Sequence, residues 1–151
     1  MMVASKLVVR RSIQIAAPPE RVWQEVESFD RLRAWFGTGH TLLKYEPRVG
    51  AMVELKVEIA GEWMHYGGKI VTFDPPRELT WENDYIPNQG WAAPTYMTIQ
   101  LTPGLGGTLV ELMHHGFERV GDAAYAASEH RGYEGGWTMR QLEALREVVE
   151  G

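Results

Sequence analysis

The segment APPERVW, residues 17–23, places the beginning of a helix directly after a strand-like segment. Residues 6–15 alternate between apolar and polar side chains and are rich in β-branched residues, which is typical of a strand. Proline is tolerated in the first turn of a helix, and Glu20 suits the positive end of the helix dipole. Apolar side chains then recur at helical spacing, so the pattern predicts a short helix over residues 19–28.

A second short helix is expected over residues 31–36, with Asp30 as its cap and Gly37 at its end. From Thr41 onward the apolar period changes to two, and Gly- and Pro-rich turns separate the segments. Short connections between consecutive strands predict antiparallel neighbours. The expected strands cover residues 41–46, 51–59, 62–73, 78–83, 95–102 and 108–117.

The chain closes with one amphipathic helix, expected from about Gly136 to Val149. A lone helix with one apolar side must lie across the face of the sheet, and such an arrangement tends to enclose a pocket. Gly132 and Gly135 precede this helix, and glycine is unfavourable inside helices. We interpret these glycines as sites of close packing against the sheet; the alternative is that they leave room beneath the backbone.

Length and composition indicate a single domain over residues 1–151. The formal net charge is −5 without runs of like charge, which argues against nucleic-acid binding. The absence of cysteine excludes disulfides and thiolate metal sites. Residues 1–6 lack the apolar run of a signal peptide, and no apolar stretch approaches membrane-spanning length, so we expect a cytoplasmic protein without membrane insertion.

Strand parity predicts the pocket walls. On the last strand Glu111 prefers solvent, which turns Leu112 and His114 inward. The same reasoning turns Trp81 inward on its strand, and Tyr66 is the preferred inward residue of a strand whose two faces are both apolar. The predicted ligand-binding residues are Trp35, Tyr66, Trp81, Met97, Ile99, Leu112, His114 and Trp137.

His114 or Tyr66 is the predicted polar anchor of a ligand, and His114 is the candidate catalytic acid or base. The alternative is a core histidine whose ring nitrogens are satisfied by neighbours. His40, His65 and His130 stand on separate elements and show no metal-ligand spacing, so we expect no metal and no cofactor. No Gly-x-Ser-x-Gly or cysteine nucleophile is present.

Several motifs occur in an order that resembles the START-like, or SRPBCC, helix-grip proteins. The motifs are PPERVW at 18–23, WF at 35–36, DPPRELTW at 74–81, HHGF at 114–117 and GW at 136–137. Within this superfamily the chain resembles the group named after the C-terminal domain of the heat-shock-protein ATPase activator. The resemblance spans about residues 8–149.

The resemblance implies an α+β helix-grip fold, in which about six or seven antiparallel strands curl around a long C-terminal helix and two short helices follow the first strand. It also implies binding of an apolar or aromatic small molecule between sheet and helix. The co-chaperone that names the group carries a further N-terminal domain, so we do not expect an activator role here.

Two alternatives to plain binding remain open. One is a cyclase, dehydratase or hydrolase that acts on a polyketide-like or aromatic substrate through His114. The other is a protein-interaction or co-chaperone-like module whose interior is filled by its six tryptophans. A homodimer is compatible with each of these functions.

Overall fold

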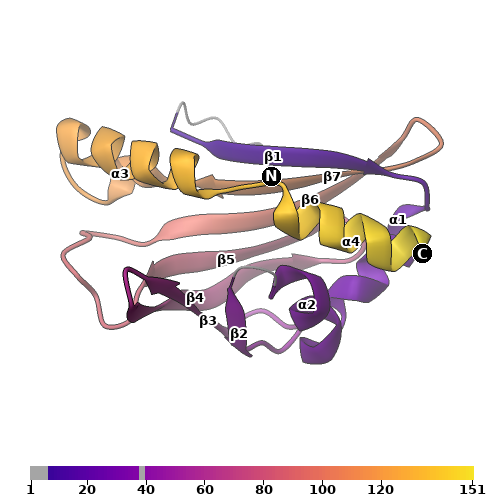
Figure 1. The fold of residues 1–151 in the computed structure, drawn as a ribbon, viewed down its shortest axis with the longest axis horizontal. Helices are drawn as coiled ribbons and strands as arrows, with labels where there is room; N and C mark the ends of the chain where they lie inside the picture. Colours follow the sequence, from indigo (N-terminus) through magenta and orange to yellow (C-terminus); the bar gives the residue numbers. More distant parts are fainter. Residues whose placement is uncertain (1–6, 38–39) are drawn as a thin grey trace.

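The computed structural model describes residues 7–37 and 40–151. Residues 1–6, where we expect no signal peptide, lie outside these ranges. The described chain forms one seven-stranded sheet, with short helices after the first strand and two helices at the C-terminal end (Figure 1). This arrangement is the α+β helix-grip architecture that the sequence predicts.

All neighbouring strands of the sheet are antiparallel, in the order β1-β7-β6-β5-β4-β3-β2. The first strand therefore pairs with the last, and the remaining connections are between consecutive strands. The strands are β1 (Val9–Ile15), β2 (Thr41–Lys44), β3 (Met52–Ile59), β4 (Glu62–Asp74), β5 (Glu78–Tyr85), β6 (Thr95–Gly104) and β7 (Gly107–His115).

Three short helical segments connect β1 to β2: α1 (Pro19–Trp23), the 3-10 helix η1 (Gln24–Val26) and α2 (Phe29–Phe36). The predicted cap of the second helix is wrong. Ser28, not Asp30, is the N-cap of α2, and its hydroxyl accepts a hydrogen bond from the Arg31 backbone at 3.2 Å. Asp30 instead lies in the first turn, where its charge favours the helix dipole.

The expected single closing helix is two helices. After the 3-10 helix η2 (Phe117–Arg119), α3 (Ala123–Gly136) runs up to an extended residue at Trp137, and α4 (Arg140–Glu150) follows. Figure 1 shows α4 across the face of the sheet and α3 beyond it, toward the opposite end. Only Ala126 of α3 is buried, so this helix lacks the apolar stripe by which sequence patterns reveal helices.

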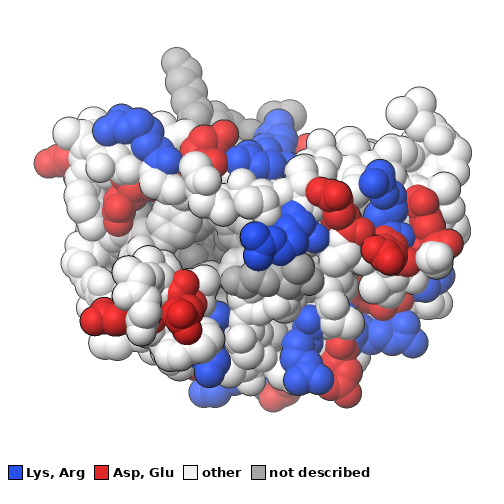
Figure 2. Space-filling model, viewed as in Figure 1, with Lys and Arg blue, Asp and Glu red and all other residues white. Residues whose placement is uncertain are grey.

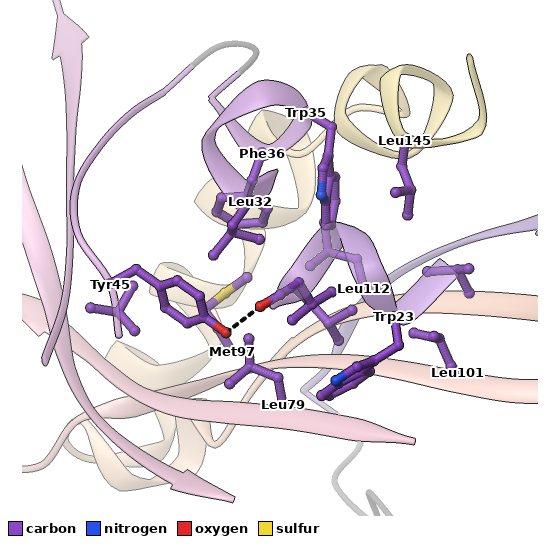
Figure 3. Close-up of a cluster of buried hydrophobic side chains, with 14 of the residues drawn as sticks. Trp23, Leu32, Trp35, Phe36, Tyr45, Leu79, Met97, Leu101, Leu112 and Leu145 are labelled. Atoms are coloured by element: carbon purple, nitrogen blue, oxygen red, sulfur yellow. Dashed lines mark hydrogen bonds between the residues drawn. The ribbon is translucent and has the colours of Figure 1, made fainter. Parts of the chain in front are cut away.

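The main core lies between the sheet, α2 and α4 (Figure 3). Trp35 and Phe36 of α2 pack edge to face at 5.6 Å, and Leu142 and Leu145 of α4 are fully buried beside them. The Tyr45 hydroxyl donates to the Val26 carbonyl at 2.6 Å, the bond dashed in Figure 3. This core fills the α4 end of the molecule.

Candidate functional site

A cavity of about 470 Å³ lies beside the main core. Its walls come from β3 to β5, from β7, from α3 and from the junction at which α3 ends and α4 begins. Figure 2 shows a hollow on this face between α3 and the strands. Most ligand-binding cavities fall between about 300 and 1,000 Å³, so the volume suits a small molecule.

Aromatic rings line much of the cavity. The His40 ring lies 5.3 Å from the Trp137 ring and 6.2 Å from the Tyr66 ring, measured between centroids. Phe36 stacks against His40 at 5.4 Å and lies 6.5 Å from the Trp137 ring. Val57, Ile59 and Met64 add aliphatic wall. An interior of this kind favours a flat apolar or aromatic guest.

A polar group of side chains forms the β5 wall. Asn83 and Tyr85 are two residues apart on β5, so both point to the same face, and Tyr66 of β4 pairs with Tyr85 in the sheet register. The Tyr133 hydroxyl of α3 donates to the Tyr85 hydroxyl at 2.7 Å. Burial raises the pKa of Tyr66 and of Tyr133 far above the usual phenol value, so both remain protonated hydrogen-bond donors.

His114 is part of a chain of hydrogen bonds that engages both of its ring nitrogens. The Trp137 indole, which can only donate, gives its proton to His114 Nδ1 across 3.3 Å. The Thr95 hydroxyl donates to the Asn83 carbonyl at 2.7 Å, which leaves its oxygen to accept from His114 Nε2 at 2.8 Å. The ring is therefore neutral and protonated on Nε2, with both nitrogens engaged. Burial lowers the pKa of His114 to about 3, and His115 and His130 act in the same direction.

Charge is sparse at the cavity. Glu129 and Arg140 are its two ionic lining residues. The Glu129 carboxylate accepts from the Trp91 indole at 2.7 Å and from the Tyr125 hydroxyl at 3.3 Å, while Arg140 is exposed at the start of α4. Burial lowers the pKa of His40, and the Arg140 charge adds to this effect, so His40 is neutral at pH 7.

The interpretation of the α3 glycines as sites of close packing against the sheet is wrong. A Cβ added at Gly132, Gly135 or Gly136 would meet no atom within 4 Å, so close packing against the sheet is not the reason for them. Gly132 and Gly136 line the cavity, and Gly135 does not. The alternative interpretation holds at the two lining positions, where the missing side chains leave room beneath the helix.

Three of the predicted ligand-binding residues line the cavity: Tyr66, His114 and Trp137. The other five, Trp35, Trp81, Met97, Ile99 and Leu112, are buried in the main core and are absent from the cavity lining. Trp81 packs edge to face against Phe36 at 5.7 Å, and Phe36 in turn stacks against His40 of the cavity wall.

Sequence reasoning missed the lining residues of α3 and the polar residues Asn83 and Tyr85. Asn83 and Tyr85 continue the inward parity of Leu79 and Trp81 along β5, and this alternation was the available signal. The α3 residues gave no such signal, because that helix has no apolar stripe to orient it.

The described residues contain neither a group of metal ligands nor a membrane-spanning helix. Within residues 7–37 and 40–151, no three His, Asp or Glu side chains are grouped so as to hold a metal ion. No helix in this part of the chain is both long and apolar enough to cross a bilayer.

Solved structures similar to this chain share its fold at low identity. A protein from Chromobacterium violaceum, CV1439, matches at 22% identity with a TM-score of 0.68, covering 95% of this chain and 98% of that one. The Aha1 dimer from Colwellia psychrerythraea matches at 18% identity and 0.55, covering 99% and 97%. DynU16, a protein in the dynemicin biosynthetic locus, matches at 18% and 0.67, covering 97% of this chain and 48% of its own.

No curated protein matches the chain. A family model does, over residues 16–150, and its description is "Activator of Hsp90 ATPase homolog 1-like protein". This match extends from the end of β1 through α4 and thus includes every element that builds the cavity. The chain therefore belongs to the family of Activator of Hsp90 ATPase homolog 1-like proteins, which have the START-like (SRPBCC) helix-grip fold typically used to bind ligands.

Proposed function

We propose that this protein binds an apolar or aromatic small molecule in the cavity beneath α3. The observation that carries the proposal is the cavity itself: about 470 Å³, with aromatic and aliphatic walls and a short row of polar groups on β5. Such a combination of apolar wall and a few placed polar groups is the usual construction of a ligand site.

A filled interior is less well supported. Trp23, Trp35 and Trp81 are buried in the main core, yet the cavity persists beside them. Trp63 is 52% exposed, so it does not fill the interior. The tryptophans therefore do not occupy the space that an interaction module with a solid core would need to fill.

Turnover through His114 is also less well supported than binding. A general base needs a free lone pair, and a general acid needs a proton that it can give to a substrate. The Nδ1 lone pair already accepts from Trp137, and the Nε2 proton is donated to Thr95. We therefore assign His114 a positioning role for Trp137, and the cyclase, dehydratase or hydrolase alternative lacks its acid or base.

Oligomeric state is a separate question. The Colwellia psychrerythraea relative is described as a dimer. Sedimentation velocity over a tenfold range of concentration would show whether this chain also forms a homodimer.

Native mass spectrometry of the purified protein, followed by denaturing extraction, tests the binding proposal first. We expect a co-purified small molecule, or an apo protein that takes up an apolar fluorescent dye. A clean apo mass together with failure to bind such dyes would overturn the proposal and favour a function carried by the surface.

A matched pair of variants places the dye. Gly132→Leu projects a side chain into the cavity, whereas Gly135→Leu, three residues along the same helix, does not line it. We expect Gly132→Leu to weaken dye binding by at least about tenfold and Gly135→Leu to leave it within about twofold, a difference of about 1 kcal/mol in binding free energy. Equal effects of the two substitutions would place the dye elsewhere.

A further inference from the structure

The Asn83 side chain makes no hydrogen bond to any residue that the structure describes. It is 1% exposed, and its Oδ1 is a buried acceptor without a partner. Its backbone carbonyl, in contrast, accepts from Thr95 at 2.7 Å. Buried polar side-chain atoms almost always have a partner, and leaving one unmade destabilises the fold. An unpartnered amide in the wall of a cavity therefore marks a position at which a guest supplies the partner.

Two phenols with unused donors flank this amide. The Tyr66 hydroxyl forms no hydrogen bond within the described part of the chain, and it lies on the strand next to Tyr85. The Tyr85 oxygen accepts from Tyr133 at 2.7 Å, which leaves the Tyr85 proton to be donated. The β5 wall thus offers one acceptor, Asn83 Oδ1, and as donors the two phenols and the Asn83 amide N–H groups.

A neutral hydroxyl group matches this set best. One hydroxyl donates a single proton and accepts through two lone pairs, so it can bond to Asn83 Oδ1 and to the phenols together. A carboxylate could accept from the phenols and from the Asn83 amide nitrogen, but it has no proton for the unpartnered Oδ1. It would also be buried without a cation at the β5 wall, because Arg140, the cationic lining residue, is exposed at the start of α4.

The rings around the site define the rest of the guest. His40, Tyr66 and Trp137 surround the space with centroid separations of 5.3 and 6.2 Å. Flat aromatic guests gain the most from such walls, through stacked and edge-to-face contacts.

We propose that the ligand is a neutral hydroxylated aromatic compound, a phenol or naphthol in chemical class, whose hydroxyl binds between Asn83 Oδ1 and the phenols of Tyr66 and Tyr85. This proposal rests on the proposed function and names the ligand class of the same cavity. Asn83 is then the residue that distinguishes a hydroxylated guest from an apolar guest of equal size.

Isothermal titration calorimetry with two probes at pH 7 tests the proposal on the unmodified protein. The probes are 2-naphthol and 2-methoxynaphthalene, which share their ring system and differ in the hydroxyl proton. We expect 2-naphthol to bind about tenfold more tightly, the effect of one well-formed hydrogen bond in a buried site. Equal affinities would overturn the hydroxyl assignment and leave apolar binding intact, whereas binding of neither probe would count against both proposals.

Variants assign the preference to its residues. Asn83→Leu removes the amide and keeps the branched shape and the number of side-chain heavy atoms, so we expect the two probes to bind with similar affinity. Tyr66→Phe, which retains the ring, should reduce the preference by about threefold. Gln100→Leu is the control on the neighbouring strand, because Gln100 is not a lining residue, and it should preserve the preference. An undiminished preference in both Asn83→Leu and Tyr66→Phe would contradict the proposed contacts.

Discussion

The indole nitrogen of Trp137 donates a hydrogen bond to Nδ1 of His114 across 3.3 Å. Trp137 is the extended residue at which α3 ends, and His114 is a buried residue of β7, so this bond ties the junction of the two C-terminal helices to the sheet. Because Trp137 also lines the cavity, the shape of the site depends on an imidazole that stays neutral.

The neutrality of His114 predicts a loss of stability in acid. Its pKa is lowered from 6.5 to about 3 in the folded state, so its contribution is fully present above pH 6.5 and declines as the pH falls toward 3. Each pH unit in that window reduces the free energy of unfolding by about 1.4 kcal/mol through this one group.

Urea unfolding at pH 7.5, 6.5 and 5.5 checks this prediction. In His114→Gln, whose amide can still donate to Thr95, the pH dependence should decrease by close to one proton. His40 and His115, whose pKa values burial also lowers, are present in both proteins and cancel in the comparison. Identical slopes would show that the pKa of His114 is the same in the folded and unfolded states, which would contradict the prediction.

Trp137→Phe should destabilise the fold by about 1–3 kcal/mol, because it removes the donor and leaves the buried Nδ1 of His114 unpartnered. Thermal and chemical unfolding measure the loss. Trp63→Phe is the matched control: Trp63 is 52% exposed and contacts Lys56 at 4.4 Å, so its replacement should change stability by about 0.5 kcal/mol or less. Comparable losses in both variants would argue against the bond.

Gly132→Ala should stabilise the protein by about 0.5–1 kcal/mol while it shrinks the cavity. The added methyl group meets no atom within 4 Å, and alanine is the better helix former. Gly135→Ala, closer to the helix end, should stabilise somewhat less and leave ligand affinity unchanged. Chemical unfolding paired with dye titration separates the two effects, and a destabilised Gly132→Ala would mean that the position is more crowded than the structure shows.

Glu25→Gln should destabilise the protein by about 1–3 kcal/mol. The Glu25 carboxylate is 1% exposed and accepts from Arg21 at 2.6 Å and from Arg31 at 3.0 Å, joining the first two helices. A neutral amide weakens both contacts. Glu27→Gln, two residues away and exposed, is the control and should be close to neutral in urea unfolding. Equal midpoints for both variants would contradict a stabilising role for this pair of contacts.

The seven strands could be predicted because turn residues separate them and because apolar side chains recur at every second position along much of their length. The alternation is not strict, since the first four residues of β5 are all buried. On β7, Leu112 and His114 are predicted to face inward, and the structure places Leu112 in the main core and His114 in the cavity wall. The expectation for α4 succeeded for the same reason, since Leu142 and Leu145 recur at helical spacing and both are fully buried.

The cavity could not be located from the sequence, because its position depends on α3. This helix buries one alanine, so no apolar period marks it, and its three glycines lower the helix propensity of its second half. Without α3, the space was expected along the final helix, and the predicted lining included Met97, Ile99 and Leu112, which lie in the core there. The bonds of His114 were equally hidden, since Thr95 and Trp137 are far from it in the chain.

The two C-terminal helices differ in what they contribute: α3 lines the cavity, and α4 packs in the core. Four lining residues of the cavity belong to α3, Glu129, Gly132, Tyr133 and Gly136, although that helix adds only Ala126 to a core. In α4 the proportion is reversed, because Gln141, Leu142 and Leu145 are buried in it. Substitutions on α3 can therefore reshape the cavity with little change to the core. Cavity shape and fold stability are thus encoded in separate helices.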